Sequence, residues 1–181
     1  DVYKRQSTDN QLFPRRGSEF TASVTLTPPW SLWDGKDYKN LATNSASPNY
    51  VKEQQEKYRW IEYHKWKFKS RTYTALSGGN KCFVLMTRVE FGVLGAYNKH
   101  KKSPFETFYV GGDGTSGYTS TYATETIGLR GYDNGSLTPN GYNGYAYDRF
   151  TVEVRYPFML NNSTNIYGLV FAEGGNAWNN V

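Results

Sequence analysis

The chain has 181 residues, of which 38% are hydrophobic and 17% aromatic, with a formal net charge of +5 and a mean hydropathy of −0.72. No run approaches the roughly 18 consecutive apolar residues of a transmembrane helix, so a helical membrane protein is excluded. Membrane strands alternate in polarity and leave a weak hydropathy signal, so a β-barrel is not excluded. The small positive charge is spread along the chain, which argues against nucleic acid as a partner.

The two ends and the single cysteine set limits on what the fold contains. Residues 1–6 resemble a translated sequencing adapter, so we predict that they are an artefact and exclude them from the predicted fold. We treat residues 7–181 as a fragment that is truncated at both ends. Cys82 is alone, which allows no internal disulfide and predicts a small buried hydrophobic side chain.

Alternation of polar and apolar residues predicts strands. A short helix is also expected over residues 50–57. The fourth predicted strand shows the alternation plainly, with Thr151 and Glu153 on one face and Phe150 and Val152 on the other. The five predicted strands cover residues 18–27, 58–76, 82–97, 149–158 and 165–178.

The lengths of these segments favour a membrane barrel. Several strands reach ten or more residues, above the usual five or six of globular proteins and near the nine to eleven that a tilted membrane strand needs. The connections alternate between long, 28–57 and 98–148, and short, 77–81 and 160–164, as they do in outer-membrane proteins. We therefore predict an all-β fold, a partial transmembrane antiparallel β-barrel of about five strands that forms an open, curved sheet.

The longest connection contains one arginine between glycines, in Gly128-Leu-Arg-Gly-Tyr132. Within a polar segment flanked by alternating strands, this arrangement predicts that Arg130 is a buried, partnered guanidinium rather than a surface charge. By contrast, His64 and His100 have no partners at metal-ligand spacing, so no metal site is expected.

Four motifs occur in a fixed order over the last part of the chain. They are Phe108-Tyr-Val-Gly-Gly112, Leu129-Arg-Gly-Tyr132, Phe150-Thr-Val-Glu-Val-Arg-Tyr-Pro157 and Phe171-Ala-Glu-Gly-Gly-Asn-Ala-Trp178. Together they resemble the C-terminal barrel of the Omp85 superfamily, and within it the assembly factors of the BamA type. Phe13-Pro-Arg-Arg-Gly17 also fits, as a periplasmic turn, so the resemblance covers nearly all of residues 7–181.

The resemblance implies a site on the inner wall of a sixteen-strand barrel. The loop 98–148 would fold back into the lumen, where Arg130 would contact Glu153 and Glu173 through charge-assisted hydrogen bonds. The residue pattern supports Glu153 independently, because it lies on the charged face of its strand, whereas the support for Glu173 is weaker. The other residues implied are Gly131 as a tight turn, Tyr132 packed against the wall, and Gly111, Gly112 and Gly128 as conformational glycines.

The resemblance also implies a function. The protein would insert and fold β-barrel proteins in the bacterial outer membrane, as a non-enzyme without cofactors. Its partners would be outer-membrane lipid, client β-barrel proteins and the lipoprotein subunits of an assembly complex.

Two alternatives remain open at this point. Another Omp85 member, such as a two-partner secretion or translocation-assembly transporter, would share the Arg-Gly-Tyr loop. A secreted carbohydrate-binding β-sandwich would share the richness in Tyr, Trp, Asn and Gly. A sandwich would bury Phe150, Val152 and Val154 in a core, whereas the barrel fragment would expose them on the convex side of its sheet.

Overall fold

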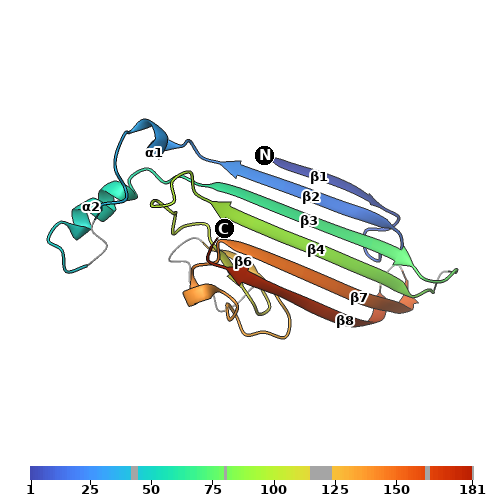
Figure 1. The fold of residues 1–181 in the computed structure, drawn as a ribbon. Coiled ribbons are helices and arrows are strands. Elements are labelled where there is room, and N and C mark those ends of the chain that lie inside the picture. The colour runs from blue at the N-terminus through green and yellow to red at the C-terminus, as the bar shows by residue number, and fades with distance from the viewer. Residues whose placement is uncertain (42–44, 80, 115–123, 162–163, 181) are drawn as a thin grey trace.

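The computed structural model describes residues 1–41, 45–79, 81–114, 124–161 and 164–180. Six long strands lie side by side in one sheet, in the order β1-β2-β3-β4-β7-β8, and every neighbouring pair is antiparallel (Figure 1). The strands are β1 (Val2–Thr8), β2 (Gly17–Leu26), β3 (His64–Ala75), β4 (Val84–Gly95), β7 (Ala146–Leu160) and β8 (Asn165–Trp178).

Smaller elements lie in the two long connections. A parallel pair, β5 (Phe108–Val110) and β6 (Glu125–Ile127), forms within the loop that joins β4 to β7. A short 3₁₀ helix, Pro139–Gly141, follows it. The connection from β2 to β3 contains α1 (Trp30–Trp33) and α2 (Tyr50–Lys57), which confirms the predicted short helix. Among the described residues, no helix has the length and apolar character needed to cross a membrane.

The sheet contains the five predicted strands and one more. Residues 1–6, which the sequence analysis excluded, contribute to β1, where Lys4 is paired with Thr21 of β2. Their origin as an artefact stays a prediction. The start predicted for the second strand, at Tyr58, was wrong, because β3 begins at His64. The reason is Glu62, whose buried carboxylate accepts hydrogen bonds from the backbone N–H and hydroxyl of Ser31 in α1 and so holds this residue outside the ladder of β3.

The connections alternate at the two ends of the sheet. The segments that join β1 to β2, β3 to β4 and β7 to β8 lie at one end, and both long connections lie at the other, together with the two termini (Figure 1). This is the arrangement that the sequence predicted, and it places the loop 96–145 at a strand end from which it can fold over one face.

The two faces of the sheet differ in chemistry. On the outer face, Phe150 and Val152 are 50% and 48% exposed, and Phe91 is 45% exposed. On the inner face, Glu90 and Glu153 are buried. A soluble sandwich needs the opposite distribution, with hydrophobic side chains in its core. The predicted fold class, an open antiparallel sheet consistent with part of a barrel, is therefore confirmed.

The buried hydrophobic side chains lie on the inner face. One cluster packs the loop strands against the wall and contains Leu94, Phe108, Val110, Ile127, Tyr147 and Ala177. A second cluster, near the short turns, contains Phe13, Tyr73, Cys82, Val84 and Met86. The prediction that Cys82 is buried is confirmed, since it is 1% exposed.

Candidate functional site

The backbone places Arg130 directly after a buried anchor. Leu129 is fully buried and forms an isolated bridge with Gly112, to whose carbonyl its N–H donates at 2.9 Å. One step earlier, the N–H of Gly111 donates to the carbonyl of Ile127 at 3.0 Å. The Gly111 bond completes the parallel β5–β6 pair, and the Gly112–Leu129 bridge just beyond it is antiparallel. They hold the backbone on both sides of the loop so that Arg130 leaves it at a defined point.

Three of the predicted glycines have backbone angles that favour glycine. Gly111, Gly112 and Gly131 have φ of 126°, 76° and 91°. A Cβ on Gly112 would also lie 1.6 Å from Oδ1 of Asn134. At Gly128 the constraint is space alone, because a Cβ there would lie 3.0 Å from backbone atoms of residues 113 and 114.

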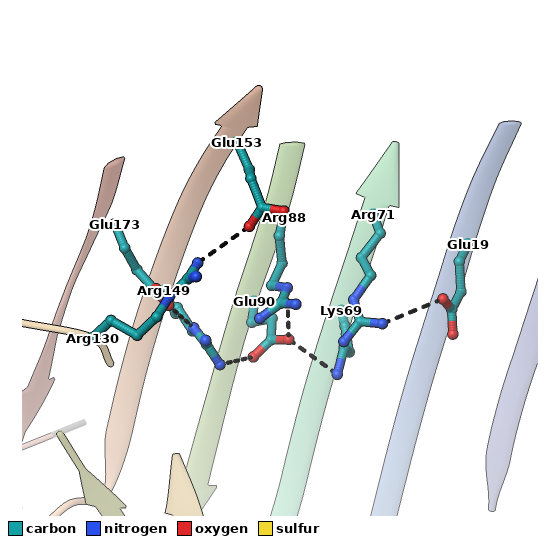
Figure 2. Close-up of polar contacts among 9 residues, drawn as sticks. All are labelled: Glu19, Lys69, Arg71, Arg88, Glu90, Arg130, Arg149, Glu153 and Glu173. Carbon is teal, nitrogen blue, oxygen red and sulfur yellow. Dashed lines mark hydrogen bonds and ion pairs between the residues drawn. The ribbon is translucent and has the colours of Figure 1, made fainter. Parts of the chain in front are cut away.

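Arg130 reaches two strands of the wall at once (Figure 2). Its Nε lies 2.6 Å from Oε2 of Glu173 on β8, and its Nη2 lies 3.4 Å from Oε2 of Glu153 on β7. Its Cζ lies 3.6 Å from the ring centroid of Phe171, within cation–π range. The structure thus brings together the three charged residues that the resemblance implied. The guanidinium is partnered as predicted, but the prediction that it is buried was wrong, because 38% of the Arg130 side chain is exposed where it crosses from the loop to the wall. Tyr132, expected to pack against the wall, is 43% exposed.

Each of the two carboxylates also binds an arginine of the wall. Nε of Arg149 lies 2.5 Å from Oε1 of Glu173, and Nε of Arg155 pairs with Oε1 of Glu153. The side chains of Glu173 and Glu153 are only 1% and 4% exposed, so the arginines are needed to compensate their charge. Sequence reasoning missed Arg149 and Arg155 as site residues, although both stand at the same alternation as Thr151 and Glu153.

The ion pairs continue across the sheet. Glu90 of β4 lies 3.7 Å from Nη1 of Arg149 and 3.1 Å from Nζ of Lys69 on β3, and the closest contact between Glu19 and Arg71 is 3.7 Å (Figure 2). These contacts follow from register, since residues paired across antiparallel strands share a face. The inner wall is therefore a surface of linked charges into which Arg130 fits.

The Arg130 guanidinium stays protonated in this site. Burial opposes the charged form, but hydrogen bonds to Glu173 and then to Glu153 raise the pKa of the Arg130 guanidinium above its ordinary value. Arginine is charged at any physiological pH in any case. The guanidinium therefore does not itself act as a pH switch.

The loop has a second ionic contact with the wall, on β3. Oε2 and Oε1 of Glu125 lie 2.8 Å from the Nζ atoms of Lys65 and Lys67, and Lys65 also lies 3.1 Å from Oε2 of Glu106. Burial alone would raise the pKa of Glu125, but hydrogen bonds from the two lysines lower it below its ordinary value. The two lysines alternate along β3 and so share a face, yet nothing in the local sequence pointed to their partner in the loop.

Comparison with known families decides what kind of protein this is. A family model described as the Omp85 superfamily domain matches residues 3–181. The chain belongs to the Omp85 superfamily. Proteins of this superfamily are outer-membrane β-barrels that assemble or transport other proteins and are in general not enzymes. A search of curated proteins found no match.

Family membership gives the two faces of the sheet their meaning. In an Omp85 barrel the charged inner face lines the lumen, and the apolar outer face contacts lipid. Within the described residues, no group of three or more His, Cys, Asp or Glu side chains could hold a metal ion. The chemistry of the Arg130 site is that of a structural contact, in which a loop is held to two neighbouring strands by charge-assisted hydrogen bonds.

Proposed function

We propose that this chain forms part of the barrel of a BamA-type assembly factor, which inserts and folds β-barrel proteins in the bacterial outer membrane. The observation that supports the proposal most is the contact of Arg130 with Glu153 and Glu173, made from within an Omp85 domain. The partners would be outer-membrane lipid, client β-barrel proteins and lipoprotein subunits of the same complex.

In this proposal the Arg130 contact is a lock that holds the loop and the barrel wall in register. Arginine suits the role because its planar guanidinium can bond two acceptors while it stacks on an aromatic ring, here that of Phe171. Client strands would pair at a seam elsewhere in the barrel. Lipid cannot solvate unpaired backbone groups, so strand pairing at the seam is driven by satisfying their hydrogen bonds and needs no nucleotide. The locked region would supply the rigid wall beside or opposite that seam.

Replacing Arg130 with alanine in the complete protein is expected to lower assembly function while leaving the strands intact. Hydrogen bonds to charged groups contribute about 1.5–3 kcal/mol each, so loss of the guanidinium should shift the loop toward the undocked state by at least roughly tenfold. The measurement is growth of a depletion strain complemented with the variant, with β-sheet content checked by circular dichroism.

Arg15→Ala is the matched control for this experiment. Arg15 is an arginine of similar side-chain exposure, 37% against 38%, and it pairs with Asp9 in the turn between β1 and β2. The control should support normal growth. Normal growth of the Arg130→Ala strain as well would contradict the proposed lock.

A further inference from the structure

The loop is attached to the wall at two places that lie on different strands. Arg130 is bound on β7 and β8, whereas Glu125 is bound by Lys65 and Lys67 on β3. Lys65 is buried, with 5% of its side chain exposed, and its Nζ also lies 4.9 Å from the ring centroid of Phe108. A buried ammonium that meets two carboxylates and an aromatic face is a fixed contact rather than a solvated surface pair.

The distance between the two attachments matches the length of the chain that joins them. Strands lie about 4.8 Å apart, so β3 and β8, three positions apart in the sheet, are separated by about 14 Å. The register places Glu173 level with Arg71, four residues beyond Lys67, which adds about 13 Å along the strand. The direct span is therefore about 19 Å, and the five-residue step from Glu125 to Arg130 covers at most about 17 Å when extended. The long lysine and arginine side chains supply the remainder.

Between the attachments, the segment stays against the wall. Ile127 is 7% exposed and belongs to the same cluster as Leu94 of β4 and Tyr147 of β7. The intervening chain thus crosses the two middle strands in contact with them. With little slack, the position of one attachment limits where the other can lie.

We propose that Lys65 and Lys67 are positioning residues of the lock, and that residues 125–130 form a strap that joins β3 to β8 across the inner face. The two lysines hold β6 against β3, which places Arg130 within reach of Glu153 and Glu173. The strap opposes separation or slippage of the four strands that it crosses. The importance of the strap for assembly rests on the proposed function. The contact of Glu125 with the two lysines is independent of that function.

A charge exchange tests the strap by a physical readout. The complete protein, purified in detergent, would carry Lys67→Glu, Glu125→Lys or both, and hydrogen exchange would be measured for the peptide that covers residues 124–130. Each single change places like charges together and should speed exchange by roughly tenfold or more. The double variant restores an opposite-charge pair between positions 67 and 125 but leaves Lys65 beside the new lysine, so it should return exchange part of the way to the original rate.

Lys69→Glu is the matched control, because Lys69 lies on the same strand and face but pairs with Glu90 of the wall. It should speed exchange of the 124–130 peptide much less than Lys67→Glu does, because Lys69 makes no ion pair with the loop in the described contacts. The proposed strap is contradicted if Lys67→Glu speeds exchange no more than Lys69→Glu does, or if the double variant exchanges as fast as the single variants. Should Lys67→Glu prevent folding, Lys67→Gln is measured in its place, and the same comparison with Lys69→Gln decides. The growth assay with Arg130→Ala reports on the proposed function separately.

Discussion

Glu173→Gln is expected to destabilise the complete barrel by about 3 kcal/mol and to release the loop from the wall. The Glu173 carboxylate, 1% exposed, binds Nε of Arg130 at 2.6 Å and Nε of Arg149 at 2.5 Å. Glutamine keeps the shape but removes the negative charge, so two guanidinium groups lose their closest compensating anion. Breaking a buried pair by removing one partner leaves an uncompensated charge, which costs about 3–5 kcal/mol.

Urea unfolding of the complete protein in lipid vesicles would measure this change. The matched control is Glu19→Gln, the same substitution at another inner-face glutamate, which pairs with Lys4 and Arg71 and touches no residue of the loop in the contacts described above. The control should cost less than about 1 kcal/mol, because the Glu19 side chain is 15% exposed against 1% for Glu173 and its contact with Arg71 is longer, at 3.7 Å. Equal effects of the two substitutions would contradict the role assigned to Glu173.

Val152→Arg is expected to destabilise the barrel by about 2–4 kcal/mol. Val152 lies near the middle of β7 on the outer face, where it is 48% exposed in the isolated sheet and would face the hydrocarbon core of the bilayer. A charged side chain there loses its hydration, and the cost is largest at the midplane.

The control for depth is Leu26→Arg, on the same outer face but at the last residue of β2. Near the interface the same substitution costs only about 0–1 kcal/mol, since the charge can reach water. The two variants would be compared by reversible unfolding in lipid vesicles. If Val152→Arg costs less than about 0.5 kcal/mol, as a water-exposed surface position would, the outer face does not contact lipid.

Much of the sheet could be predicted from the sequence because strand alternation is a local property. The residues next to Phe150, Val152 and Glu153 suffice to assign each to one face of the strand. The structure places the first two on the outer face and Glu153 on the inner face, as predicted. The error at residues 58–63 has the opposite cause. Glu62 accepts hydrogen bonds from the backbone N–H and hydroxyl of Ser31, thirty-one residues earlier in the chain, and no local pattern contains that contact.

The site divides in the same way. Arg130, Glu153 and Glu173 could be named because ordered motifs carried them, although alternation alone gave weaker support for Glu173. The partnership of Glu125 with Lys65 and Lys67 spans almost sixty residues and depends on the register of β3 with its neighbours. Register and loop placement are set by tertiary packing, so a charged face can be recognised from sequence while the pairs within it cannot.

The central claim is that the apolar face of this sheet contacts lipid and the charged face lines a water-filled lumen. The most direct measurement places a nitroxide at Val152 or at Ser23, which is paired with Lys67 on the inner face, in the complete protein with Cys82→Ser, reconstituted in bilayers. Collision rates with oxygen and with a water-soluble nickel complex are then compared. The label at 152 should collide more readily with oxygen than with the nickel complex, and the label at 23 should show the reverse. A label at 152 that collides more readily with the nickel complex would contradict the claim that this face contacts lipid.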